Sequence, residues 1–166
     1  GSVGEWAART AGAWGNSLLV SICPSATAYE QTAVTTINDA GMAVGDTTVT
    51  VTSGTNINVG DIINFAESGG YEYRVTSKST NDINFVRKDS GTGGLHSAPT
   101  NGGNVRRRWR YYDQVAGAPG TSPYASARSG VNDELHVVIV DEDGAISGTP
   151  GEILEVYDSV SKGSDS

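Results

Sequence analysis

The stretch that decides the fold reads NDELHVVIVDEDGAISGTPGEILEVYDSVSK and spans residues 132–162. Its apolar, β-branched run at 135–140 predicts a strand, and the density of apolar residues favours burial on both faces. The glycine-containing segments 141–144 and 148–151 are typical of turns. A second strand or amphipathic element is expected over 153–160. The stretch therefore predicts a sheet.

The composition of the whole chain points the same way. The 166 residues suffice for one ordinary domain or two small ones, and 37% of them are hydrophobic, which is enough for a core. Leu, Met and Phe are scarce, Gly is abundant, and Val, Ile, Thr and Tyr supply most of the apolar positions. This bias favours strands and turns over helices.

Charge and cysteine content exclude several classes of protein. The formal net charge of −8 disfavours binding to nucleic acid or to anionic lipid. No apolar run approaches the roughly 18 residues that span a bilayer, so membrane insertion is not expected. Cys23 is the only cysteine, so no internal disulfide can form, which fits assembly in a reducing compartment.

The middle of the chain reads as a series of short strands. The turn Val44-Gly45-Asp46 recurs as Val59-Gly60-Asp61, and Gly, Asn or Asp residues separate the apolar segments. Such spacing predicts a small barrel or sandwich. The expected strands cover residues 47–52, 62–65, 71–76 and 83–87.

The predicted fold class is mainly β with minor α. We expect a small antiparallel β-barrel at residues 34–103, inserted into a discontinuous, β-rich (α+β) domain formed by residues 3–33 and 104–166. In that second domain, 18–22 reads as a strand, Glu5–Arg9 as the tail of a helix, and 105–112 as a further strand.

His136 is the first candidate for chemistry. It lies beside Asp133 and Glu134, and a hydrolase would need it to activate a nucleophile held on a sharp turn. The chain has no Gly-x-Ser-x-Gly elbow, and His136 falls inside an alternating strand. The preferred interpretation is a structural histidine in a protein that is not an enzyme.

The acidic run Asp141-Glu142-Asp143-Gly144 raises the question of a calcium site. A calcium loop needs alternating oxygen ligands and a distant bidentate Glu, which residues 147–152 do not provide. A solvated hairpin turn is preferred. Cys23, His96 and His136 lack metal-ligand spacing, and the glycine-rich loops at 91–94 and 117–122 lack the Lys of a phosphate loop. The sequence thus predicts no metal, cofactor or catalytic residue.

The segment 106–112 interleaves basic and aromatic residues. It is compatible with a platform for single-stranded nucleic acid. In a strand, however, Arg106, Arg108 and Arg110 face one way, and Arg107, Trp109 and Tyr111 face the other. Pairing with carboxylates of the same chain or of a neighbouring subunit is preferred, which makes Arg106, Arg108 and Arg110 candidate interface residues.

Three segments, in this order, resemble the tail sheath protein of contractile-tailed (myovirus-type) bacteriophages. The first segment runs from Trp6-Ala7-Ala8-Arg9 through Gly15-Asn16-Ser17-Leu18. The second is Ala118-Pro119-Gly120-Thr121-Ser122, and the third is the stretch from Asn132 to Lys162. Together they cover less than a third of the chain. The Val-Gly-Asp turns, with Gly91-Thr92 and His96, more loosely resemble barrel insertions of phage tail proteins.

The resemblance implies a structural role. Sheath subunits form rings around the tail tube and contract to drive it through the host envelope, without cofactor or catalysis. The partners would be other sheath subunits and the tube, in a virion assembled in the host cytoplasm. The chain would be a middle fragment lacking both native termini, and alone a monomer. The alternative is a surface-exposed tail module that binds a host glycan or another tail protein. A groove of exposed aromatic side chains, such as Tyr71 and Tyr73, would favour this alternative.

Overall fold

The computed structural model describes residues 12–67 and 69–163, and their helices are short. They comprise η1 (Ala13–Ser17), α1 (Ala26–Tyr29), η2 (Tyr112–Gln114) and α2 (Pro123–Ser126). None of the helices in these ranges is long and apolar enough to cross a membrane. The Glu5–Arg9 helix predicted from the sequence lies outside the described residues.

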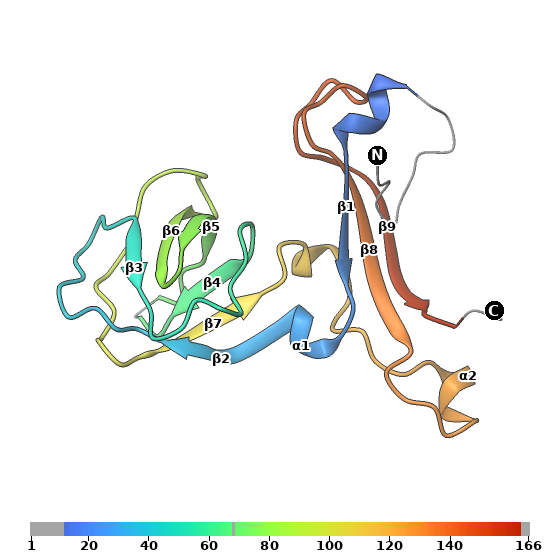
Figure 1. Ribbon diagram of the computed structural model, residues 1–166, viewed down its shortest axis with the longest axis horizontal. Coiled ribbons are helices and arrows are strands. Elements are labelled where there is room, and N and C mark those ends of the chain that lie inside the picture. Colours follow the sequence, from blue (N-terminus) through green and yellow to red (C-terminus); the bar gives the residue numbers. More distant parts are fainter. Residues whose placement is uncertain (1–11, 68, 164–166) are drawn as a thin grey trace. The chain divides into compact units, whose positions relative to one another are not determined.

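The architecture is mainly β, as predicted, and consists of two antiparallel sheets (Figure 1). The chain divides into two compact units: a discontinuous base unit, residues 1–24 and 114–166, and an inserted unit, residues 25–113. The strands are β1 (Leu18–Cys23), β2 (Glu30–Thr36), β3 (Thr48–Thr50), β4 (Ile62–Phe65), β5 (Tyr73–Ser79), β6 (Asp82–Arg87), β7 (Asn104–Arg108), β8 (Glu134–Asp141) and β9 (Glu152–Ser161).

The inserted unit is wider at both ends than the predicted range 34–103. Its six-stranded sheet has the order β2-β7-β4-β5-β6-β3. β2, in a Thr- and Ala-rich segment whose sequence predicts a connector with weak strand character, pairs with β7, and β7 pairs on its other side with β4. Because these pairings draw both flanking segments into the sheet, the boundaries move outward to 24/25 and 113/114.

One bridge joins the two outer strands of this sheet. Ile37, just after β2, pairs with Val51, just after β3. The Asn38 N–H donates to the Thr50 carbonyl and the Thr52 N–H donates to the Thr36 carbonyl, both at 2.9 Å. The named strands themselves form an open sheet, since no continuous ladder connects β2 to β3.

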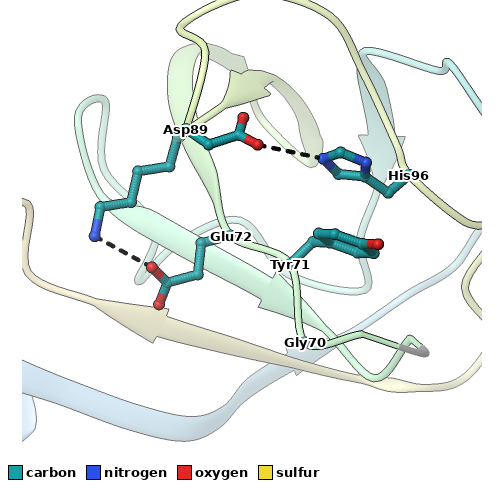
Figure 2. A pocket seen from close by; sticks show the side chains of 6 residues that line it. Gly70, Tyr71, Glu72, Asp89 and His96 are labelled. Carbon is teal, nitrogen blue, oxygen red and sulfur yellow. Dashed lines mark hydrogen bonds and ion pairs between the residues drawn. The ribbon is translucent and has the colours of Figure 1, made fainter.

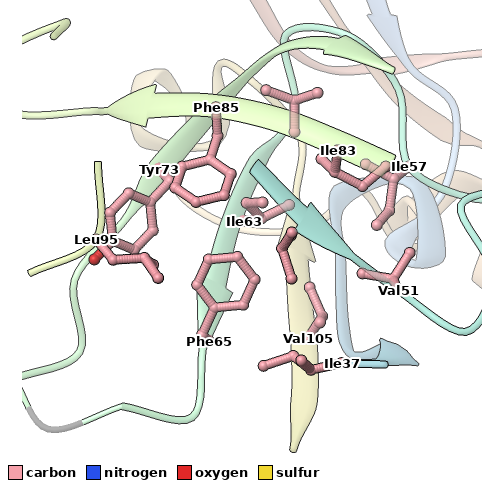
Figure 3. Packing of buried hydrophobic residues seen from close by; sticks show 12 residues of the cluster. Ile37, Val51, Ile57, Ile63, Phe65, Tyr73, Ile83, Phe85, Leu95 and Val105 are labelled. Atoms are coloured by element: carbon pink, nitrogen blue, oxygen red, sulfur yellow. The ribbon is translucent and has the colours of Figure 1, made fainter. Parts of the chain in front are cut away.

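The core of the inserted unit is built around three aromatic rings (Figure 3). Phe65 lies 5.5 Å from both Tyr73 and Phe85, measured between ring centroids, and the rings are tilted rather than parallel. Such geometry suits the charge distribution of aromatic rings. The surrounding buried side chains are Ile37, Val49, Val51, Ile57, Ile63, Val75, Ile83, Leu95 and Val105.

The two Val-Gly-Asp turns have the same conformation, as their sequences suggest. Gly45 has φ +93° and Gly60 has φ +92°, a region that glycine adopts without steric cost. In each turn an aspartate carboxylate accepts the backbone N–H three residues earlier, at 2.7 Å for Asp46 and 2.8 Å for Asp61. Glycine at the third position is the signature of a type II turn, which here leads the chain towards β3 and β4.

The base unit contains a three-stranded sheet in the order β1-β8-β9. β8, the predicted strand 135–140, is its central strand. Burial on both faces was expected of it, but only His136, Val138 and Val140 on one face are buried, whereas Leu135 and Val137 are half-buried. In an antiparallel sheet one face can remain partly open, because no crossover helices need to cover it.

Candidate functional site

Burial alternates along residues 105–111, as the sequence predicts. Val105, Arg107, Trp109 and Tyr111 are buried, while Arg106 and Arg108 are half-buried and Arg110 is exposed. The strand is shorter than the predicted 105–112, since β7 ends at Arg108, Arg110 lies in a turn and η2 begins at Tyr112. Strand geometry therefore places only Arg106 and Arg108 on the outer face of the sheet, opposite the core of the inserted unit.

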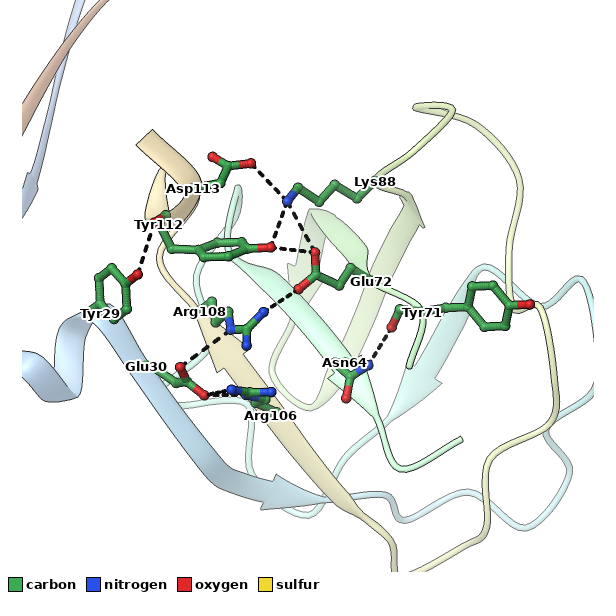
Figure 4. Close-up of polar contacts among 10 residues, drawn as sticks. All are labelled: Tyr29, Glu30, Asn64, Tyr71, Glu72, Lys88, Arg106, Arg108, Tyr112 and Asp113. Carbon is green, nitrogen blue, oxygen red and sulfur yellow. Dashed lines mark hydrogen bonds and ion pairs between the residues drawn. The ribbon is translucent and has the colours of Figure 1, made fainter. Parts of the chain in front are cut away.

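Arg106 and Arg108 are paired with carboxylates of the same unit (Figure 4). Arg106 forms an ion pair with Glu30 of β2. Arg108 donates from Nη1 to Glu72 Oε1 at 2.7 Å, and its Nε lies 3.5 Å from Glu30 Oε2. Since Glu30 and Arg108 are direct cross-strand partners, the pairing reinforces the β2–β7 ladder.

Tyr112 organises the second half of this cluster. Its hydroxyl donates to Glu72 Oε2 at 2.7 Å, and Lys88 Nζ donates to the Tyr112 hydroxyl at 2.9 Å. The ring also lies against two cations, with Lys88 Nζ 4.4 Å and the Arg108 guanidinium 4.7 Å from its centroid. Lys88 completes its contacts with Asp113 at 3.0 Å. The polar network of the inserted unit therefore consists of Glu30, Glu72, Lys88, Arg106, Arg108, Tyr112 and Asp113.

The electrostatics of Glu72 follow from this arrangement. Partial burial by itself would raise the pKa of its carboxyl, but the hydrogen bonds from Tyr112 and Lys88 and the charges of Lys88 and Arg108 outweigh it and lower the pKa. Burial opposes the charge of Arg108 too, yet Glu30 and Glu72 raise its pKa. The network is therefore held in its ionised form.

The network joins the two places where the chain enters and leaves the inserted unit. Tyr29, at the start, donates its hydroxyl to the Tyr112 carbonyl at 3.0 Å, and the two rings meet edge to face with centroids 6.5 Å apart. Arg107, on the inner side of β7, donates to the carbonyls of Thr27 and Ala28. The geometry thus gives Arg106, Arg107 and Arg108 a role inside the unit.

Arg110 differs from the other two candidates. It is exposed, and its guanidinium lies 5.3 Å from the centroid of the Tyr111 ring. Among the three predicted interface residues, Arg110 has the side chain most available to a neighbouring subunit.

We predict that Arg108→Ala and Arg110→Ala separate these roles. Arg108→Ala removes a hydrogen bond between charged groups and should lower the stability of the inserted unit by about 2 kcal/mol. Arg110→Ala, at an exposed position, should change it by less than about 0.5 kcal/mol. Urea unfolding followed by tryptophan fluorescence measures both. Equal destabilisation by the two variants would contradict the division.

His136 is placed at an irregularity between β8 and β9. Leu135 pairs with Val160 and Val137 with Tyr157, so two β9 residues, Asp158 and Ser159, lie opposite one β8 residue. This is the geometry of a β-bulge, and Ser159 adopts φ +54° there. The imidazole is fully buried.

Both ring nitrogens of His136 have partners. Nε2 lies 2.9 Å from the Gly117 carbonyl oxygen. Nδ1 accepts the Ser159 N–H at 3.0 Å and lies 3.0 Å from Asp158 Oδ1. A hydrolase using His136 needs an imidazole that a substrate can reach, and this ring offers no surface. The geometry favours the structural interpretation, and the absence of catalysis stays a prediction.

Asp141 organises the acidic turn that the sequence offered as a calcium candidate. Its carboxylate accepts the N–H groups of Gly144, Ile146 and Ser147 at 3.1, 2.9 and 2.6 Å. It also accepts the hydroxyls of Ser147, at 2.8 Å, and Ser17. Burial would raise the pKa of Asp141, but these hydrogen bonds outweigh it and hold the pKa well below its usual value. The geometry is that of a turn closed by one carboxylate.

We predict that Asp141→Asn changes the acid sensitivity of the base unit. Because the folded-state pKa of Asp141 lies below its unfolded value, its stabilisation is present above about pH 4 and is lost as the pH falls through the folded pKa. The variant should melt below the wild type at pH 7 and lose less stability on acidification. Thermal unfolding by circular dichroism measures this, with exposed Glu142→Gln as the matched control. Parallel pH profiles for wild type and Asp141→Asn would contradict the prediction.

No metal centre is defined by the side chains in the ranges 12–67 and 69–163, where no group of three or more His, Cys, Asp or Glu is arranged to hold an ion. Cys23 is buried in β1, opposite His136 of β8.

The Ser122 N–H and hydroxyl of the loop 117–122 donate to Asp133 at 2.8 and 2.7 Å. This loop therefore has a local structural function.

The two tyrosines named for a binding module do not form a shared groove. Tyr73 is fully buried in the core, whereas Tyr71 is 38% exposed and stacks on His96 with ring centroids 3.8 Å apart. The neighbours of Tyr71 could not be predicted from the sequence, because Asp89 and His96 lie in a loop whose course depends on the fold. Sequence reasoning also missed Glu30 and Glu72 as partners of the arginines, and Lys88 as a partner of Glu72, although each is a charged residue in or beside a strand.

Comparisons with protein-family models, with curated proteins and with solved structures give no significant match to this chain. The assignment of a function therefore depends on the residues and their geometry.

Proposed function

We propose that this chain is a portion of a tail sheath subunit of a contractile-tailed bacteriophage, with a structural and non-catalytic role. In this role its rings surround the tail tube, and its partners are other sheath subunits and the tube. The protein would be assembled in the host cytoplasm and would reside in the virion.

One observation carries the proposal: the segments that resemble sheath proteins converge in the base unit. The first segment meets the third through Ser17 and Leu18, because the Ser17 hydroxyl donates to Asp141 and Leu18 pairs with Asp141 in the β1–β8 ladder. The part of that segment at residues 6–9 lies outside the described residues. The loop 118–122 joins the same sheet, because the Gly120 N–H donates to Glu134 Oε2 at 2.9 Å and the Glu134 N–H donates to the Gly120 carbonyl. Segments separated by the inserted unit are thus parts of one sheet, as a shared ancestral domain would require.

The inserted unit fits the role of a surface module in this proposal. We propose further that its sheet closes into a small barrel, supported by the Ile37–Val51 bridge between the outer strands. Closure would remove the open edges that favour association of isolated sheets.

Hydrogen exchange followed by NMR tests the barrel. The amides of Asn38 and Thr52, which form the bridging hydrogen bonds, should exchange as slowly as amides in the middle of the sheet, such as that of Val75. Exchange of both at the rate of an open loop would contradict closure.

Immunogold electron microscopy of the phage tests the function. An antibody raised against this chain should label the contractile part of the tail at regular intervals, because a sheath contains many copies in stacked rings. Labelling confined to the baseplate or fibres would favour the alternative, a binding module. If the antibody labelled neither intact nor contracted tails, although it detects the protein in denatured phage, both the sheath function and the binding module would be contradicted.

A further inference from the structure

A pocket of about 420 Å³ opens on the inserted unit and shares Glu72 and Lys88 with the polar network (Figure 2). Its wall is formed by Gly70, Tyr71, Glu72, Lys88, Asp89 and His96. All of them belong to the inserted unit, so a ligand could bind in this pocket whether or not the chain is part of a sheath.

Asp89 and His96 form a loose pair at this pocket. Asp89 Oδ2 lies 3.8 Å from His96 Nε2, an ion-pair distance that is longer than a direct hydrogen bond. No atom fits on the line between the two, but a hydroxyl oxygen to one side of the pair can lie about 2.8 Å from both, donating to the carboxylate and accepting from an Nε2–H. The pair is therefore suited to bind a hydroxyl.

The charges of the pocket limit the class of ligand. Glu72 and Lys88 satisfy each other and further partners in the polar network, at 3.2 Å between them. Asp89 keeps a side chain that is 69% exposed, with His96 as its nearby partner. The carboxylate that remains available disfavours an anionic ligand by repulsion and desolvation.

Tyr71 supplies an aromatic surface. It stacks on His96 with 17° between the ring planes, and 38% of the residue is exposed. Glu72 and Lys88 also line the pocket, but the Lys88 ammonium group is used by Glu72, Tyr112 and Asp113. An aromatic surface beside a hydroxyl-binding pair is suited to a ring that carries C–H groups on its face and hydroxyls on its rim.

We propose that this pocket binds one neutral pyranose unit of a saccharide. One hydroxyl lies beside the Asp89–His96 pair, within hydrogen-bond distance of both side chains, and the sugar ring packs against the exposed part of Tyr71. The site is small and open, so a single sugar binds weakly, with a Kd in the millimolar range that corresponds to about −4 kcal/mol.

NMR titration of the folded protein tests the site. Glucose, galactose, mannose and N-acetylglucosamine are added separately to the ¹⁵N-labelled chain up to about 50 mM, well above the expected Kd. At least one should give saturable shifts concentrated on the amides of Gly70, Tyr71, Asp89 and His96. Asp89→Ala should weaken that binding at least tenfold, and Tyr124→Ala, an exposed tyrosine of the base unit, should leave it unchanged.

Three results would overturn the proposal. The first is an absence of saturable shifts with all four sugars. The second is binding that Asp89→Ala does not weaken, although its spectrum shows a folded protein. The third is a response to methylammonium chloride but to none of the sugars, which would make the pocket a cation site. Because Asp89 is exposed, its substitution does not threaten the fold.

Discussion

Phe65→Ala should destabilise the inserted unit by about 3–5 kcal/mol, the range for deleting a buried aromatic ring. Phe65 is fully buried and contacts both other rings of the aromatic centre, Tyr73 and Phe85. Its removal leaves a cavity that strands on both sides of the core cannot fill. For a unit of this size, the melting temperature should fall by more than about 10 °C.

Differential scanning calorimetry measures this loss. Tyr124→Ala, at a tyrosine that is 68% exposed in the base unit, is the control and should leave the melting temperature within about 2 °C of the wild type. A Phe65→Ala protein that melts like this control would show that the three rings do not form the core.

His136→Ala should destabilise the base unit by about 3 kcal/mol. The substitution deletes a fully buried ring, which typically costs about 2–5 kcal/mol, and removes the imidazole partner of the Gly117 carbonyl and of the Ser159 N–H. The bulge residue Ser159, with φ +54°, then lacks the contact that fixes its N–H. The β8–β9 pairing around the bulge should loosen first.

Amide exchange in β8 and β9 locates the effect. In His136→Ala the amides near residues 135–137 and 157–160 should lose protection, while the inserted unit keeps its own. The exposed Glu155→Ala in the same strand serves as the control. If His136→Ala preserved the stability of the base unit, the imidazole would not be structural, and a chemical function for it would regain support.

The sequence predicted best those elements whose signal is local. The run 135–140 is β8, and segments 62–65 and 83–87 are β4 and β6, because alternation and apolar β-branched residues mark strands wherever they pair. β2 was predicted only as a connector with weak strand character. Its segment EQTAVTT is largely polar, and what makes it a strand is the pairing of Glu30 and Gln31 with Arg108 and Arg107, far away in sequence.

In the candidate site, too, features set by local periodicity were predicted and contacts between segments far apart in sequence were not. The facing of Arg106 and Arg108 followed from strand periodicity, whereas Arg110 lies in the turn after β7. The partners of Arg106 and Arg108 did not follow, because Glu30 and Glu72 reach them only through the sheet order β2-β7-β4-β5. Tyr71 and Tyr73 look equivalent at a spacing of two. Only Tyr73 lies in β5, and Tyr71 precedes the strand, so burial separates them. Loop-dependent juxtapositions such as Asp89 and His96 carry no local signal.

The central proposal, that this chain belongs to a contractile sheath, is tested most directly by electron microscopy of the complete product of its gene. On this proposal, that product should assemble into tubes of stacked rings in negative stain. The 166-residue chain by itself should remain monomeric by light scattering. A well-folded complete product that forms neither rings nor tubes would contradict the account.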